Sequence, residues 1–208
     1  MLRNGFGEHN IQGIGDKHIP LIHNVMATDI VVDISDRATD SLFVLFNTDV
    51  GREHLRTRMG VPEAIVEGLA SFGFSAICNV LAAIKVARQQ HLGGQDVIVT
   101  VATDGAAMYA SELARISARD YPSGFDGVAA AEVRAEHLDG ITTGDMIECT
   151  REDRDRIFNL GYFTWVEQQG VTLTEFEARR DPAFWSEVRG IVEEWDAMIG
   201  AFDARVAG

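Results

Sequence analysis

The sequence predicts an α/β protein, because apolar runs typical of buried strands alternate with helical periodicity in its first hundred residues. Residues 30–34 form a short β-branched run, and residues 97–102 are almost continuously apolar. Between these runs, apolar residues recur at steps of three and four. Strands without a polar face belong in the middle of larger sheets. The pattern therefore predicts a sheet with helices packed against it.

The lead-in to the first strand is predicted to be irregular, because residues 1–28 are rich in Gly, His and Asn and show no clear period. After the strand at 30–34, Ser35 offers an N-cap for a helix over residues 36–49. Residues 51–61 are charged and interrupted, and a short helix is expected over residues 62–70.

The second strand is expected to follow a long helix. Ser75 offers an N-cap, and apolar residues at helical spacing predict an amphipathic helix over residues 76–91, closed by the glycines at 93–94. The apolar run at 97–102 reads as a strand buried on both faces. It ends in a turn at residues 103–105.

The second half of the chain has a different character. Residues 111–150 are mixed, with two loop signals. A capping box at Thr150 predicts a helix over residues 151–169, and Asp181 followed by proline predicts another that ends near residue 205. An apolar stripe runs along one side of this last helix, as expected for packing in a core or against a subunit.

Composition excludes several classes of protein. With 208 residues and 46% hydrophobic content the chain should be globular, and its net charge of −14 should repel nucleic acid and anionic lipid. No apolar run approaches the roughly 18 residues of a membrane span, and the start lacks a signal peptide, so a cytoplasmic location is expected. Cys78 and Cys149 should be ordinary reduced thiols, and no histidine has metal-ligand spacing.

Lysine is scarce in this sequence. Only Lys17 and Lys85 are lysines among the 18 basic residues. Chemistry that needs a lysine amine therefore has two candidates. Lys85 lies in the middle of a predicted helix and reads as structural, and Lys17 reads as a loop residue.

The predicted sheet looks incomplete. Two strands make a sheet that is marginal in water, and unpaired edges invite association. Another chain would supply the remaining strands. The alternative is that residues 111–150 contain strands that the pattern does not reveal.

Three segments, in order, resemble the cysteine synthase and cystathionine β-synthase family of fold-type II pyridoxal-phosphate (PLP) enzymes. Residues 9–15 read His-Asn-Ile-Gln-Gly-Ile-Gly, similar to a run that follows the family's phosphate-binding loop. Residues 73–79 resemble the glycine-serine turn that opens a long helix, and residues 97–109 resemble the closing strand and turn. The resemblance covers roughly residues 5–110 and implies a partial three-layer αβα domain of the tryptophan synthase β type.

What precedes these segments in the family is missing from this sequence. The Schiff-base lysine, the substrate loop and the glycine-rich phosphate cradle all come earlier in the family order. The resemblance therefore implies the carboxy-terminal half of the domain in residues 1–110, with a larger α subunit that carries the lysine and the phosphate loop. Residues 111–208 would form a helical extension for subunit packing, and an α2β2 heterotetramer is expected.

The resemblance also implies site residues. A hydroxyl at a late strand end meets the cofactor's ring nitrogen, which favours Thr103, with Asp104 as a rival; each could equally be a turn residue. Gly105 stands where the family often has Ser. The substrate side of the cofactor would be lined by Gly13, Ile14 and Gly15, because glycine lets the backbone of this loop approach the substrate closely. Asp16 and Lys17 could assist departure of a β-hydroxyl as general acids, or could simply be polar surface.

The function favoured by the resemblance is that of one subunit of a PLP-dependent lyase whose active site is shared with the α subunit. It would be a dehydratase of phenylserine, serine or threonine, giving a 2-oxo acid and ammonia. A β-replacement enzyme of the cysteine synthase kind is one alternative, and a non-catalytic regulatory partner of a complete PLP enzyme is another. A truncated piece of a longer enzyme is a third possibility, against which the initial Met and the complete terminal helix argue mildly.

Overall fold

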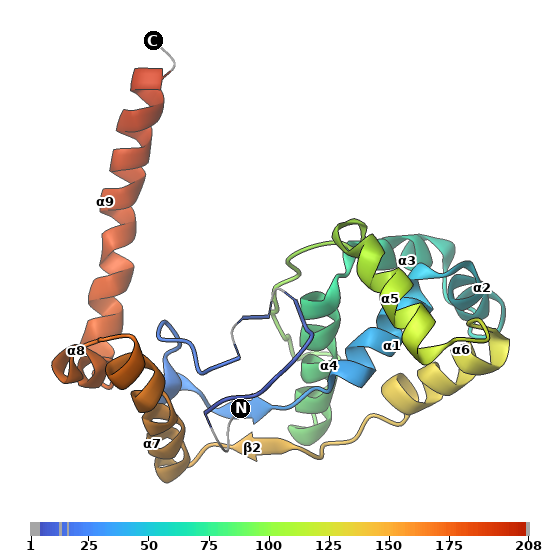
Figure 1. Ribbon diagram of the computed structural model, residues 1–208, viewed down its shortest axis with the longest axis horizontal. Coiled ribbons are helices and arrows are strands. Elements are labelled where there is room, and N and C mark those ends of the chain that lie inside the picture. Colours follow the sequence, from blue (N-terminus) through green and yellow to red (C-terminus); the bar gives the residue numbers. More distant parts are fainter. Residues whose placement is uncertain (1–4, 13, 16, 207–208) are drawn as a thin grey trace. The chain divides into compact units, whose positions relative to one another are not determined.

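A computed structural model describes residues 5–12, 14–15 and 17–206 (Figure 1). The chain forms two compact units, each assembled from separate stretches of sequence. Unit one comprises residues 1–8, 16–29 and 149–208, and unit two comprises residues 9–15 and 30–148. This division differs from the predicted boundary near residue 110, because residues 111–148 pack within unit two.

Unit two is a helical body built around one central helix, α1 (Asp36–Asn47), which contacts α2, α4, α5 and α6. The remaining helical elements are α2 (Asp49–Thr57), α3 (Glu63–Gly68), η2 (Leu69–Ser71), α4 (Phe74–Gln89), η3 (Ala106–Tyr109), α5 (Ala110–Asp120), α6 (Gly127–Arg134) and η4 (Ala135–Asp139). Four consecutive residues of α1, at positions 42–45, are buried in the core, together with Phe74 and Ile77 of α4. The burial of this apolar surface is the main force that holds unit two together.

The sheet of unit two has two short strands, β1 (Ile30–Val32) and β2 (Met146–Glu148). They pair antiparallel, with Ile30 opposite Glu148. The chain is thus mostly helical with a small sheet, which is compatible with the α/β class only in a coarse sense. The described residues form no three-layer αβα arrangement. The first predicted strand is shorter than expected and only half-buried.

The prediction of a second strand at residues 97–102 was wrong. Residues 97–102 have no sheet partner among the described residues, and their side chains are exposed: Val97 is 83% and Val99 is 89% accessible. A β-branched run favours extended backbone, but a strand also needs a neighbour to accept its ladder of hydrogen bonds. Nothing in the described part of the chain lies beside this run to do so.

The helices follow the local signals closely. Ser35 caps α1 by accepting a hydrogen bond from the amide of Ala38 at 3.2 Å. The expected helix at 76–91 is α4, but its N-cap is Gly73 and Ser75 lies inside the first turn. Helix α2 was missed, because its charged residues hide a face that buries only Gly51 and Leu55.

Unit one contains η1 (Val25–Ala27), α7 (Arg151–Leu160), η5 (Phe163–Gln168), α8 (Leu173–Ala178) and α9 (Pro182–Val206). The capping box of Thr150 and Asp153 is confirmed, although α7 ends at residue 160 and is followed by a wider turn. Phe158 and Phe176 pack against each other in its interior, and the guanidinium of Arg179 lies over both rings.

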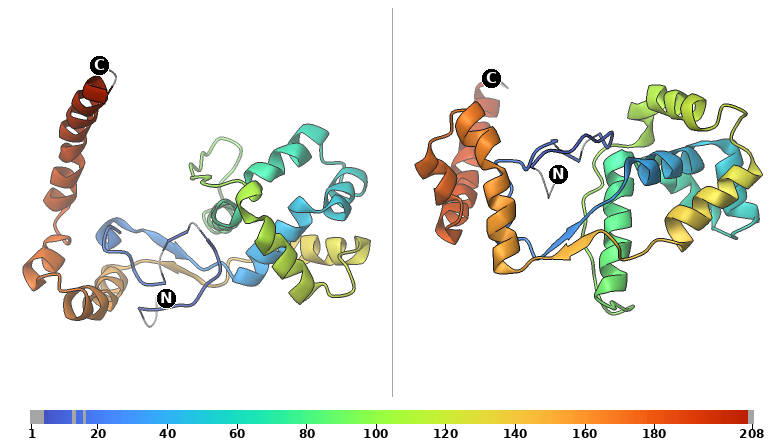
Figure 2. Two further views of the ribbon diagram at one scale, coloured as in Figure 1. Left: turned by 45° about the horizontal axis from the view of Figure 1, so that its top comes forward. Right: turned by 60° about the horizontal axis from the view of Figure 1, so that its bottom comes forward.

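Helix α9 is 25 residues long, and none of its residues is buried (Figures 1 and 2). Its apolar stripe is exposed, with Trp195 and Met198 at 60% and 69% accessibility. Among the described residues no single helix is long and apolar enough to cross a membrane. One pair, residues 63–71 with α4, passes by length and composition alone, but it is bent by 119° at the break between its two parts.

Candidate functional site

Residues 103–105, which were predicted as a turn, lie in an irregular segment that is bonded to the beginning of α4. The amide of Gly73 donates to the carbonyl oxygen of Asp104 at 2.7 Å. The hydroxyls of Ser75 and Thr103 lie 2.5 Å apart, and the hydroxyl of Tyr109 donates to Oδ2 of Asp104 at 3.0 Å. Residues 28 positions apart thus form one hydrogen-bonded cluster.

The packing beneath this cluster explains why it forms. Phe74 is wholly buried and stacks on Phe43, with the ring centroids 4.3 Å apart, and it meets Tyr109 edge to face at 5.1 Å. Aromatic pairs in these geometries are favourable beyond their buried area. Burial and the hydrogen bond to Asp104 raise the pKa of Tyr109, so its hydroxyl stays protonated and keeps donating.

The Ser75–Thr103 pair has a spare donor. Each hydroxyl can donate one hydrogen bond, so when one donates to the other a second O–H remains available to an acceptor. Ser75 is buried, whereas Thr103 is exposed. The cluster therefore presents a neutral hydroxyl at a fixed position, which suits an aromatic ring nitrogen. Ser75 and Tyr109 were not predicted as site residues, although both lie in segments that carry the resemblance.

The predicted substrate loop is held to unit two by the residues before it. The amide of Asn10 donates to Asp36 at 3.0 Å, and its side chain donates to Asp40 at 2.9 Å. Asp40 is buried and also accepts from Arg119 at 2.7 Å. Burial raises the pKa of Asp40, and the hydrogen bond and positive charge of Arg119 partly offset this rise.

Beyond this anchor the loop is open. Ile14 is exposed, and Gly15 has a φ of +129°, a conformation that favours glycine. No hydrogen bond or ion pair given by the described residues joins Ile14 or Gly15 to Thr103. Two other predicted residues, Gly13 and Asp16, lie outside the described residues.

The two lysines have other surroundings. Lys17 belongs to unit one, where Nζ pairs with Glu8 at 2.8 Å on the surface. Lys85 is buried, and its Nζ donates to the carbonyl oxygen of Asp33 at 3.0 Å. It lies ten residues along α4 from Ser75, a rise of about 15 Å. Lys85 is therefore not at the hydroxyl cluster.

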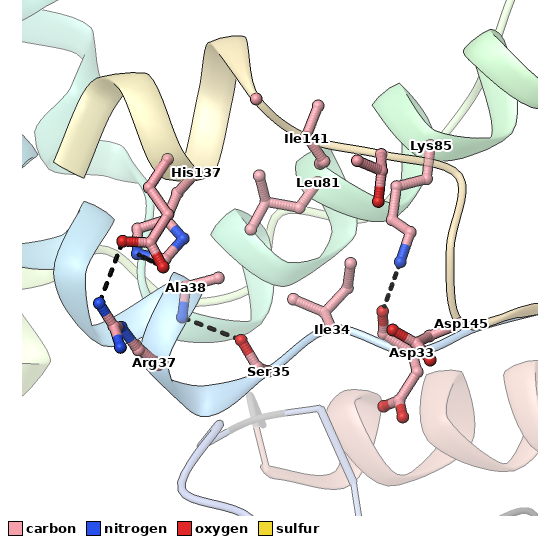
Figure 3. A pocket seen from close by; sticks show the side chains of 13 residues that line it. Asp33, Ile34, Ser35, Arg37, Ala38, Leu81, Lys85, His137, Ile141 and Asp145 are labelled. Carbon is pink, nitrogen blue, oxygen red and sulfur yellow. Dashed lines mark hydrogen bonds and ion pairs between the residues drawn. The ribbon is translucent and has the colours of Figure 1, made fainter. Parts of the chain in front are cut away.

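A separate cavity of about 320 Å³ opens around Lys85 (Figure 3). Lys85 points from α4 toward Asp33, and Asp145 lies alongside. At the other end Arg37 pairs with Glu136 at 3.0 Å. No pattern in the sequence marks this cavity, because its walls come from three distant segments, residues 33–38, 81–85 and 136–145.

Burial also governs the histidine of this cavity. His137 has a lowered pKa, chiefly because burial disfavours the imidazolium, with Arg37 adding to the effect and Glu136 opposing it. The group is therefore a neutral imidazole near neutral pH. In the part of the chain that the structure describes, no cluster of His, Cys, Asp and Glu could hold a metal ion.

These residues fit only part of a PLP site. A neutral donor such as the Thr103 hydroxyl would suit the ring nitrogen of PLP. The described residues offer no amine beside it and no glycine-rich loop that opens a helix toward a phosphate. Comparison with known protein families, with curated proteins and with solved structures found no match to this chain.

Proposed function

We propose that this chain is the β subunit of a heteromeric PLP-dependent lyase that shares its active site with a larger α subunit. The observation that carries the proposal is the Thr103 hydroxyl, which Ser75, in the first turn of α4, holds at the end of an apolar segment. The ordered likeness of residues 9–15, 73–79 and 97–109 to fold-type II enzymes gives this hydroxyl its expected role, a contact with the ring nitrogen.

The surroundings of the two lysines support a second subunit. Lys17 lies on the surface in an ion pair, and the Lys85 amine is buried against a backbone carbonyl. A Schiff-base lysine has to be held beside the cofactor. The α subunit would therefore provide the lysine and the phosphate loop.

The proposed reaction is the dehydration and deamination of a β-hydroxy amino acid such as phenylserine, serine or threonine. PLP, when bound, supplies an electron sink for the bond that breaks at the α-carbon. The β-hydroxyl would leave as water after protonation, and a second water molecule would hydrolyse the imine of the resulting unsaturated amino acid. The water lost and the water consumed cancel, so the net products are a 2-oxo acid and ammonia.

This chain would orient and enclose the reactants. Thr103 would hold the ring by a neutral hydrogen bond, and Ile14 and Gly15 would line the substrate side together with Gly13. Asp16 and Lys17 stay predictions as proton donors to the departing hydroxyl. A cytoplasmic location and an α2β2 assembly also stay predictions.

Substitution of Thr103 tests the proposal. The test requires a polypeptide with a glycine-rich loop and a lysine motif, which would be sought in the neighbouring reading frame, produced and mixed with this chain. Thr103→Val should lower turnover at least about tenfold, as loss of one hydrogen bond to a charged or polarised group does, and should change the absorbance of the bound cofactor. The matched control Thr57→Val, on the exposed side of α2, should change neither.

Two outcomes would count against this function. One is an unchanged absorbance and rate in Thr103→Val. The other is ammonia release by the purified chain alone, in the presence of PLP and a hydroxyamino acid, since that would remove the need for an α subunit.

A further inference from the structure

Residues 97–102 have the composition of a strand but form neither a helix nor a strand, and they pair with no strand in the described part of the chain. Within the described part of the chain, the only hydrogen bond to the backbone of this segment is donated by the Asn79 side chain to the carbonyl oxygen of Val101, at 2.9 Å. Three valines at alternate positions, 97, 99 and 101, are 64% to 89% exposed. Water must therefore satisfy almost all the peptide groups of a run with no charged side chain.

Both ends of this segment are fixed. At its beginning the amide of Gly93 donates to the Asp96 carboxylate at 2.7 Å, which closes the turn after α4. At its end Thr103 and Asp104 are bonded to the start of α4. The segment therefore runs back along α4, as Figure 2 shows. Because both ends are already held, pairing with another strand would cost less conformational entropy than it would for a free segment.

Exposed edges of this kind are templates for strand pairing, and soluble proteins normally cover or charge them. Here no charge, proline or bulge protects residues 97–102. We propose that Val97–Ala102 is a docking strand that pairs with the edge strand of a sheet in a partner chain. The inference rests on the proposed function in one respect, since the partner would be the α subunit.

A partner with its own sheet fits better than a second copy of this chain. Two copies paired through this segment would form a two-stranded ribbon, which is marginal in water and leaves both outer edges bare. The segment is apolar at positions 97, 99 and 101 and, apart from Thr100, at the positions between and after them, as in strands of a larger sheet that is covered on both faces. Two copies would also bring together net charges of −14.

Hydrogen exchange would test the docking strand directly. The full chain would be compared alone and with the neighbouring-frame polypeptide prepared without PLP, so that docking is measured apart from cofactor chemistry. Exchange of the amides at 97–102 should slow more than about tenfold on mixing, because ladder hydrogen bonds close amides to solvent.

Paired variants identify the edges involved. Val99→Pro removes one ladder donor and should weaken association at least about tenfold, whereas Val99→Thr keeps the N–H and a β-branched side chain and should associate like the parent chain. Neighbouring amides of a strand point to opposite edges, so Thr100→Pro should weaken association as well if both edges are paired.

The outcomes separate the two proposals. A mixed complex that turns over substrate while 97–102 exchanges freely would overturn the docking strand and leave the enzyme proposal standing. Protection of 97–102 in a complex that neither binds PLP nor turns over substrate would support docking and overturn the enzyme. Protection in the isolated chain with dimer formation would replace the partner by a second copy, and the absence of any complex would overturn both.

Discussion

Substitution of Gly73 by alanine should destabilise the turn that carries Thr103. A Cβ atom at this position would lie 2.6 Å from the carbonyl oxygen of Asp104 and 2.7 Å from Cε2 of Tyr109. The φ of Gly73 is −83°, which any residue adopts, so the effect is one of space alone. To relieve the contact, residues 103–105 must move away from α4.

The magnitude follows from what the movement breaks. Overpacking against fixed neighbours costs about 1–3 kcal/mol. Loss of the 2.7 Å hydrogen bond from Gly73 to Asp104 adds about 0.5–1.5 kcal/mol. We expect Gly73→Ala to lower the free energy of unfolding by about 1.5–4.5 kcal/mol.

Gly68→Ala is a matched control with the opposite sign. Gly68 has helical dihedral angles, φ −63° and ψ −21°, and no atom lies within 4 Å of the place that an alanine Cβ would occupy. Alanine should therefore stabilise the chain by about 0.4–1 kcal/mol. Urea unfolding followed by circular dichroism measures both variants. The steric argument would be refuted if the Gly73→Ala and Gly68→Ala variants were equally stable, or if the Gly73→Ala variant were as stable as the parent protein.

Three further predictions concern other parts of the chain. The lowered pKa of His137 means that the unfolded state takes up a proton first, so its contribution to stability is present above about pH 6.5 and is lost as pH falls through the folded pKa. His137→Gln should reduce the fall in unfolding free energy between pH 7.5 and 5.5. The lowered pKa of His23 leaves a residual pH slope of the same sign in the variant. An identical pH slope in the variant and the parent protein would contradict the prediction. Lys85→Met should change stability by no more than about 1–2 kcal/mol, because relief of the cost of burying the amine offsets loss of its one hydrogen bond to the carbonyl oxygen of Asp33. Cofactor binding by the mixed subunits should stay intact, and failure to bind cofactor would give Lys85 a role in the site. Removal of residues after 150 should abolish the two-subunit complex in gel filtration, because the exposed stripe of α9 is the kind of surface that subunits cover, and an intact complex would show that the extension does not hold the partner.

Much of the local structure could be predicted from short stretches of sequence. The caps at Ser35 and Thr150 were found because each side chain bonds to an amide three residues away. The long helix α4 and the stripe of α9 follow from apolar spacing along one segment. Of the candidate site, Thr103 to Gly105 was predicted as a turn, and the structure adds the partners that fix it.

The rest depends on residues far apart in the chain. The run at 97–102 has the composition of a strand, but whether it becomes one depends on a neighbour that the described residues do not supply. The Ser75–Thr103 pair, the buried Asp40 anchor and the cavity around Lys85 each join segments that the sequence separates by dozens of residues. Local hydrogen bonding and side-chain periodicity are written in the sequence, whereas long-range pairing is decided by which surfaces the folded chain brings together.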